Sequence, residues 1–129
     1  IVNCLNEQIV PILCIGESLE QKKNNITKDV LISQVHKNIP KEANMNNLII
    51  AYEPLWAIGT GLTPTLDEIT EIHTFIKNNI PQSKNYKILY GGSVKSSNCK
   101  EILAQTNVDG VLVGSSSIEI DEFNKIIES

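Results

Sequence analysis

Glu53 is the first residue whose type and position suggest chemistry. It directly follows a short apolar run, Leu48–Tyr52, that predicts a buried strand. Pro54 comes next and cannot continue a strand ladder, so the carboxylate lies at the strand end. In parallel α/β folds the reacting groups collect where strands end and helices begin. We therefore predict that Glu53 is a general base, and the alternative is an acid that only faces water.

The residues after this carboxylate predict a lid. The segment Pro54–Gly61, PLWAIGTG, is apolar, yet its proline and two glycines make it a poor helix or strand. A loop of this composition would expose Leu55, Trp56 and Ile58 to water unless it closed over a ligand. Closure would bury these side chains and exclude solvent from the reacting atoms. The alternative is a packed surface loop.

Small residues follow two further predicted strands. Gly91-Gly92-Ser93 follows the predicted strand Tyr86–Tyr90, and Gly114-Ser115-Ser116 follows Val108–Val113. Small residues let a ligand approach the backbone, whose N–H groups can hold an oxyanion at a helix N-terminus. The chain contains no arginine, so guanidinium clamps are excluded. Together these turns predict a phosphate site made of backbone N–H groups; either alone could be a tight connection.

These positions are organised by a pattern that occurs four times, a short apolar run followed by a segment with helical periodicity. Such repetition predicts βα units with parallel strands. The runs are Val10–Ile15, Leu48–Tyr52, Tyr86–Tyr90 and Val108–Val113. The first is apolar on both faces, which is typical of parallel strands covered by helices. A complete eight-stranded barrel takes about 250 residues, so this chain is too short to form one. Four such units fit either half of that barrel or a small doubly wound sheet.

Each predicted helix has a start signal or an apolar stripe. Ser18 with Gln21 and Thr65 with Glu68 predict capping boxes, and Ser96 or Ser97 predicts a third cap. The predicted buried stripes are Ile26, Val30 and Val35 in a helix that reaches Pro40; Leu66, Ile69, Ile72, Ile76 and Ile80; Ile102 and Leu103; and Ile120, Phe123 and Ile127. Val2, Leu5 and Ile9 also have helical spacing without a cap before them, so we expect the chain to begin inside a helix.

Composition excludes several classes of protein. The 129 residues are 41% hydrophobic and 20% charged with a net charge of −4, which is typical of a soluble globular chain. No basic run could follow a nucleic-acid backbone, and no apolar stretch approaches the roughly 20 residues of a membrane span. Three widely spaced cysteines, Cys4, Cys14 and Cys99, predict a reduced, cytoplasmic setting without a zinc site.

Four segments together resemble the triosephosphate isomerase family. They are PILCIGES, AYEPLWAIGTG, ILYGGSV and VDGVLVGSSS, in the family's order and spacing. The resemblance implies an α/β fold, the C-terminal half of a TIM (β/α)8 barrel, with residues 1–129 as a single partial domain. It also implies interconversion of dihydroxyacetone phosphate and glyceraldehyde 3-phosphate, in glycolysis and gluconeogenesis, with no cofactor and no metal.

The resemblance carries roles over to individual residues. Glu53 corresponds to the base that moves a proton between adjacent substrate carbons. The main-chain N–H groups of Gly59, Ser93, Gly114 and Ser115 correspond to those that hold the substrate phosphate. Ser115 stands where the family commonly has a second glycine, and the N–H group is retained.

The family's lid and its supports also have counterparts. The lid residues are Pro54, Leu55, Trp56, Ala57, Ile58, Gly59, Thr60, Gly61, Leu62, Thr63 and Pro64, of which the first three and last three match the hinges. Pro64 replaces the more usual alanine, which predicts a stiffer second hinge. Tyr90 resembles the tyrosine that latches the closed lid. Glu17 is expected to act in the same latch by accepting the Trp56 indole N–H when the lid moves; alternatively it serves the first turn of a helix.

Other candidate residues are assigned to structure. Cys14 resembles a buried family cysteine beside the base, which we assign to packing rather than nucleophilic chemistry. His36 and His73 lie on predicted helices away from the strand ends. We expect both to be surface or partly buried structural histidines.

The family's active site also needs a lysine and an electrophilic histidine from its N-terminal half, and its dimer needs an interdigitating loop. No segment here matches these motifs, so we expect a C-terminal piece with little or no activity alone, whose open sheet edges favour self-association or instability. The complete enzyme is expected to be a homodimer. The alternatives are another phosphate-binding βα-barrel enzyme and a non-catalytic half-barrel that binds small phosphates or a partner chain.

Overall fold

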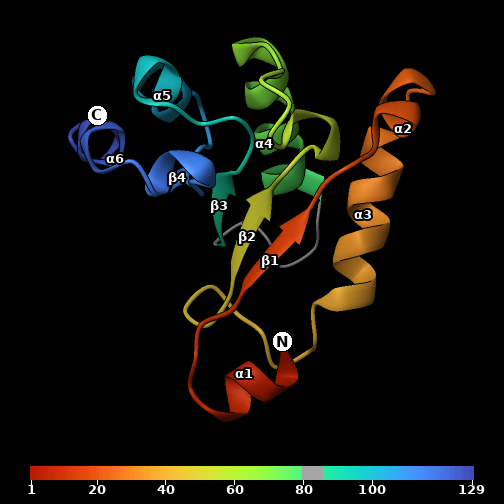
Figure 1. The fold of residues 1–129 in the computed structure, drawn as a ribbon. Helices are drawn as coiled ribbons and strands as arrows, with labels where there is room; N and C mark the ends of the chain where they lie inside the picture. The colour runs from red at the N-terminus through yellow and green to blue at the C-terminus, as the bar shows by residue number, and fades with distance from the viewer. Residues whose placement is uncertain (80–85) are drawn as a thin grey trace.

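The computed structural model describes residues 1–79 and 86–129, and its centre is a four-stranded parallel sheet in the order β1-β2-β3-β4 (Figure 1). The strands are β1 (Ile12–Ile15), β2 (Ile49–Tyr52), β3 (Lys87–Tyr90) and β4 (Gly110–Val111). The helices are α1 (Val2–Asn6), α2 (Leu19–Lys23), α3 (Thr27–Asn38), α4 (Leu66–Asn79), α5 (Ser96–Leu103) and α6 (Ile120–Ile127). Two 3₁₀ turns, η1 (Leu55–Ala57) and η3 (Ser115–Ser117), follow β2 and β4. The predicted parallel βα units are therefore confirmed.

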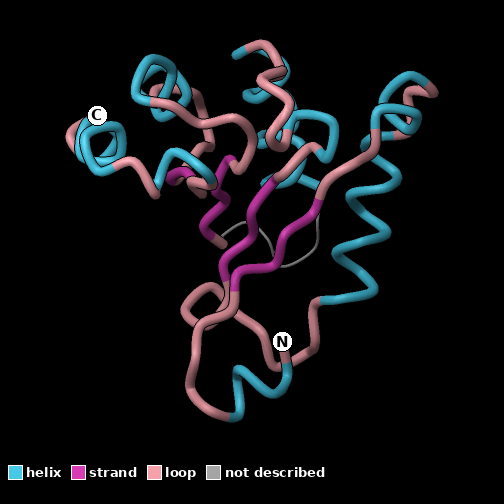
Figure 2. The backbone as a smooth tube through the Cα atoms, viewed as in Figure 1, coloured by secondary structure: helices cyan, strands magenta, loops and turns pink. Residues whose placement is uncertain are grey.

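The strands are paired in a register that aligns their carboxyl ends. Ile15 lies opposite Tyr52, Tyr52 opposite Tyr90, and Tyr90 opposite Val111. The loops that follow the strands therefore begin at one edge of the sheet, as the secondary-structure colouring in Figure 2 shows. A register shift by one residue would exchange the two faces of a strand, so burial of one face fixes this alignment.

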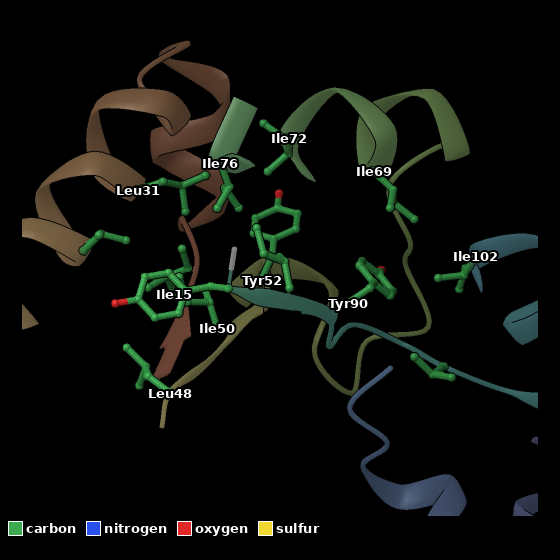
Figure 3. Packing of buried hydrophobic residues seen from close by; sticks show 14 of the residues in the cluster. Ile15, Leu31, Leu48, Ile50, Tyr52, Ile69, Ile72, Ile76, Tyr90 and Ile102 are labelled. Carbon is green, nitrogen blue, oxygen red and sulfur yellow. The ribbon is translucent and has the colours of Figure 1, made fainter. Parts of the chain in front are cut away.

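The hydrophobic core lies between the sheet and the helices α3, α4 and α5. Ile50, Tyr52 and Tyr90 lie in it (Figure 3). Ile88, opposite Ile50 in the sheet, is also buried in this core. Leu31 of α3 covers these side chains, together with Ile69, Ile72 and Ile76 of α4 and Ile102 of α5. The side chains at alternate strand positions thus define one buried face.

The opposite face of β1 is open, which corrects the expectation that this strand is covered on both sides. Ile12 and Cys14 alternate with Leu13 and Ile15, and both are exposed. Apolar residues on both faces of a strand do not ensure that both faces are buried. In the described residues, helices pack on only one face of β1, so the face with Ile12 and Cys14 is exposed. Cys14 is accordingly exposed rather than buried.

The predicted helix between Gly16 and Pro40 is divided into α2 and α3. Asn25 lies between them with φ of 55°, a left-handed conformation that asparagine tolerates and that ends a helix. The break changes the buried stripe. Leu31 and Val35 are buried, whereas Ile26 is 39% exposed. The prediction of Ile26 as a core residue was therefore wrong, because it assumed one continuous helix.

Two of the predicted caps are confirmed. The N–H of Gln21 donates to Ser18 Oγ at 3.2 Å while the N–H of Ser18 donates to Gln21 Oε1 at 2.8 Å. Thr65 and Glu68 form the same reciprocal pair at 2.8 and 3.2 Å. The α4 stripe is also confirmed at Ile69, Ile72 and Ile76, while Ile80 lies outside the described residues.

The third cap was predicted at the wrong residue. The N-cap of α5 is Lys95, whose N–H donates to the side-chain oxygen of Asn98 at 2.8 Å. Ser96 is the first helical residue, and its N–H and hydroxyl donate to the two carboxylate oxygens of Glu122 at 2.7 and 2.9 Å. These bonds lower the pKa of Glu122. The serine therefore connects α5 to α6 instead of capping its own helix.

The predicted stripe of α6 is also wrong. Ile126 is the buried residue, whereas Ile120 and Ile127 are 75% and 67% exposed and Phe123 is partly buried. The reason is that α6 packs on α5 through the face that contains Ile126. Within the described residues nothing covers the face that contains Ile120 and Ile127.

His73 lies inside the core, which corrects its assignment as a surface or partly buried residue. Its side chain is fully buried, with the ring centroid 6.0 Å from Tyr52 in an edge-on arrangement and 6.5 Å from Tyr90. Nδ1 lies 3.1 Å from the carbonyl oxygen of Asn107. Burial lowers the pKa of His73 to about 4. His36 is exposed, as expected.

We expect Leu31→Ala to lower the free energy of unfolding far more than Ile26→Ala. A buried leucine replaced by alanine costs about 2–5 kcal/mol, whereas truncation of a largely exposed side chain costs under about 1 kcal/mol. Urea unfolding followed by circular dichroism measures both. Equal losses would contradict the division of the helix at Asn25.

The burial of His73 predicts that stability decreases with acid. Because its folded pKa of about 4 lies below the ordinary value of 6.5, the unfolded chain takes up the proton first as pH falls. Its contribution is therefore complete above pH 6.5 and is lost between pH 6.5 and 4. From pH 7 to pH 5 the free energy of unfolding should fall by about 2 kcal/mol more in the unsubstituted chain than in His73→Gln. His36→Gln is the control and should keep the full dependence.

Candidate functional site

Glu53 is held at the carboxyl end of β2 between the backbones of its two neighbours in the sheet. Its N–H donates to the carbonyl oxygen of Ile15 at 2.7 Å, and the N–H of Gly91 donates to Tyr52 O at 2.9 Å. A Cβ atom on Gly91 would lie 2.6 Å from Cγ and Oε1 of Glu53. A Cβ on Gly16 would collide with the Glu53 carbonyl group. Glycine is thus required on both sides for the carboxylate to take this position.

The surroundings of Glu53 suit a proton acceptor. Burial raises the pKa of this carboxyl, and a hydrogen bond from the Cys14 thiol lowers it in part. A general base works best when its pKa approaches the working pH. Burial and the Glu53 carboxylate raise the pKa of the Cys14 thiol, so the nucleophilic thiolate is disfavoured. Cys14 therefore lies beside the base, as the sequence resemblance implies, and acts as a hydrogen-bond donor to it.

A cavity of about 630 Å³ opens next to Glu53, and it is large enough for a small ligand. It brings together every residue that the sequence nominated for proton transfer or phosphate binding. Its lining includes Glu53, Gly59, Ser93, Gly114 and Ser115, with Ile58 and Gly61 of the lid, Gly91, Gly92, Val94 and Lys95 after β3, and Leu112, Val113 and Ser116 around the next strand end.

The backbone of this cavity offers donors for an anion. In the described part of the chain, the N–H groups of Gly59, Ser93 and Gly114 have no intramolecular acceptor. Ser115 opens the 3₁₀ turn η3 at the same wall. Side-chain bonds fix the turns, since the hydroxyl of Ser93 donates to Ala57 O at 2.7 Å and thereby ties the turn after β3 to the lid. The arrangement can hold a phosphate with backbone donors.

Lys95 is a cavity residue that sequence reasoning missed. It is exposed, it lines the cavity, and it is the N-cap of α5. An ammonium group beside free N–H donors adds to the attraction for an anion. Its position two residues after Ser93 was the available signal, but a lone exposed lysine is common on any surface.

The lid follows β2, passes through η1 and ends at the start of α4. Its residues Ile58, Gly59 and Gly61 form part of the cavity wall. Gly59 and Gly61 have φ of 67° and 77°, conformations that favour glycine. Leu55, Ile58 and Leu62 are exposed, while Ala57 is buried beneath them. The predicted loop with exposed apolar side chains is therefore present, and Trp56 differs from the prediction because it is partly buried.

Glu17 accepts the predicted hydrogen bond from Trp56, while its role during lid movement stays a prediction. The indole N–H donates to Glu17 Oε1 at 2.8 Å, and the Tyr52 hydroxyl donates to the same carboxylate at 3.2–3.3 Å. Glu17 precedes the N-cap Ser18, so the alternative role in the first turn of α2 does not apply. Sequence reasoning missed Tyr52, whose pKa is raised by burial and by the Glu17 carboxylate.

The Tyr90 hydroxyl forms no hydrogen bond with the described lid residues in this structure. The hydroxyl is buried, lies directly against Gly92, and has no hydrogen-bond partner in the described residues. Burial raises the pKa of Tyr90 to about 12. Its predicted role as a latch for the closed lid stays a prediction, and an unpartnered hydroxyl beside the turn after β3 is available for it.

Two structural features are absent from the described residues. They contain no group of three or more His, Cys, Asp or Glu side chains that could hold a metal ion. None of the helices in this part is long and apolar enough to cross a bilayer. Cys4, Cys14 and Cys99 are free thiols.

Comparison with known proteins decides the family. Residues 1–129 match the protein family described as triosephosphate isomerase. The chain belongs to the triosephosphate isomerase family. It is 44% identical over 120 residues to the triosephosphate isomerase of Rhizobium meliloti (strain 1021), covering 89% of this chain and 47% of that protein. It is also 44% identical over 126 residues to that of Mesorhizobium japonicum, covering 94% of this chain and 49% of the relative.

A solved structure gives the same result. The crystal structure of triosephosphate isomerase from Bartonella henselae superposes with a TM-score of 0.81 at 36% identity, covering 93% of this chain and 49% of that one. The chain therefore spans about half the length of these triosephosphate isomerases. The expected half of a TIM barrel is confirmed over the doubly wound alternative.

We expect Gly91→Ala to displace the Glu53 side chain, because the new Cβ would lie 2.6 Å from two of its atoms. The displaced carboxylate should gain water, and its raised pKa should fall toward the ordinary value of 4.5. A ¹³C NMR titration of the Glu53 carboxyl measures this. Gly110→Ala is the control, because it meets only the end of the Leu89 side chain. An unchanged titration in Gly91→Ala would contradict the described position of Glu53.

Proposed function

We propose that this chain provides the base, the lid and the phosphate site of a triosephosphate isomerase, which interconverts dihydroxyacetone phosphate and glyceraldehyde 3-phosphate. The observation that carries the proposal is a single cavity with Glu53 and the backbone donors of Gly59, Ser93, Gly114 and Ser115 in its walls. Membership of the family supports the same substrate.

The roles follow from the geometry. The backbone N–H groups anchor the phosphate and leave the carbon end of a triose near Glu53, whose raised pKa favours uptake of a proton. Glu53 takes this proton from the carbon beside the ketose carbonyl and leaves an enediolate. The carboxylic acid then returns the proton to the former carbonyl carbon, while the hydroxyl proton moves from the first oxygen to the second, which gives the aldose. The lid from Pro54 to Pro64 would bury its exposed apolar side chains on closing and exclude water from this intermediate.

The described lining of the cavity contains no histidine, and its one lysine, Lys95, is beside the backbone N–H donors for the phosphate, so the family's histidine and lysine have no match in it. His73 is enclosed in the core, and His36 is exposed on the outer helix α3. We therefore propose that these groups come from the other half of a full-length barrel, in a cytoplasmic homodimer. The 129 residues alone should show little or no turnover, because a positioned acid or base contributes roughly 10²–10⁴-fold.

The experiment is Glu53→Gln in the full-length protein that carries this chain. Loss of the base should lower isomerase turnover by about 10²–10⁴-fold, while the affinity for inorganic phosphate stays nearly unchanged. Glu101→Gln, an exposed change on α5, is the control. Full turnover in Glu53→Gln would contradict the proposed base. Phosphate binding without turnover in the unsubstituted full-length protein would instead favour the non-catalytic alternative.

A further inference from the structure

A second cavity, of about 350 Å³, lies behind the lid and shares no lining residue with the cavity beside Glu53. Its lining residues come from the α2–α3 segment, from α4, and from Glu17, Tyr52 and Pro64. Glu17, which holds Trp56, lines one part of it, and Pro64 of the second hinge lines another. The cavity is thus connected to the lid at two points, through Pro64 in its wall and through the hydrogen bond from Trp56 to Glu17.

Glu17 is the buried charge in this cavity. Its side chain is 1% exposed, and its hydrogen bonds come from two neutral donors, the indole of Trp56 and the hydroxyl of Tyr52. The ion pairs found in the described residues do not include it. A buried carboxylate without a counter-charge is costly and depends strongly on each donor that it has.

Lys22 lines the same cavity and contacts Trp56, the residue that donates to Glu17. Its Nζ lies 2.7 Å from Glu68 Oε1 and 4.0 Å from the centroid of the Trp56 ring. The hydrogen bond from Lys22 lowers the pKa of Glu68. In this state the indole gives its N–H to Glu17 and the face of its ring to Lys22, so one side chain separates the lysine from the buried carboxylate.

Lid closure would change both contacts at once. Trp56 belongs to the first hinge, so a moving hinge would take the indole donor away from Glu17 and the ring away from Lys22. Glu17 would then keep one neutral donor, Tyr52. The flexible stem of Lys22 allows its ammonium group to reach another acceptor within the same cavity.

We propose that Lys22 is a positioning residue for the lid, which exchanges Glu68 for Glu17 as its carboxylate partner when Trp56 leaves. The exchange supplies a counter-charge to Glu17 in the closed state and thereby offsets the loss of the indole donor. The proposal rests on the proposed function, since it assumes that the lid closes over a bound phosphate.

The test uses the full-length protein that carries this chain, labelled with 5-fluorotryptophan and followed by ¹⁹F NMR without ligand. Trp56 is the only tryptophan of these 129 residues, and Trp56→Phe assigns its signal. Glu17→Ala removes the acceptor and marks the signal of the detached indole. Lys22→Gln should lower the detached population about three- to fivefold, the effect of a partly exposed ion pair, and Lys22→Arg should restore it. In the Glu17→Gln background, Lys22→Gln should have no further effect.

Lys28→Gln is a matched control. Lys28 also pairs with a glutamate of α4, Glu71, at 2.7 Å and lies 5.4 Å from an aromatic ring, that of Phe75. It should leave the detached population unchanged. Equal effects of Lys22→Gln and Lys28→Gln, or a single signal that Lys22→Gln does not move, would overturn the proposal. Failure of inorganic phosphate to shift the populations of the unsubstituted full-length protein would count against the proposed function instead, since the ligand-free comparison does not use phosphate.

Discussion

The parallel register of the sheet is the constraint on which the rest of the structure depends. It places Ile15, Tyr52 and Tyr90 side by side, so the loops after their strands start at one edge. Gly16 after β1 then leaves room for the Glu53 carbonyl group, and Gly91 after β3 leaves room for the Glu53 side chain. A slip by one residue would turn the tyrosines away from the helices and leave their rings unpacked.

The same alternation connects the two cavities. Tyr52 and Glu53 are consecutive, yet Tyr52 lines the cavity behind the lid and Glu53 lines the cavity in front of it. Successive side chains of a strand point to opposite sides, so one short strand fixes both the support of Trp56 and the position of the carboxylate. The lid begins at the next residue, Pro54, so its first hinge lies between the two cavities.

Much of this arrangement could be predicted because its signals are local. The residues of the cavity are predicted by a carboxylate before proline at the end of one apolar run and by glycine turns after two later runs. Ser18 with Gln21 predicts the start of a helix. The failures concern packing between distant segments. The burial of His73 depends on Tyr52 and Tyr90, and the exposure of Ile120 depends on which face α6 turns to α5. Periodicity defines an apolar stripe but does not provide the surface that covers it.

The most direct measurement of the central claim is an experimental structure of the full-length protein with bound inorganic phosphate. The account predicts the anion on the backbone N–H groups of Ser93, Gly114 and Ser115, with the carboxylate of Glu53 facing the same cavity. A phosphate bound elsewhere, or Glu53 turned to the opposite side of the sheet, would contradict it.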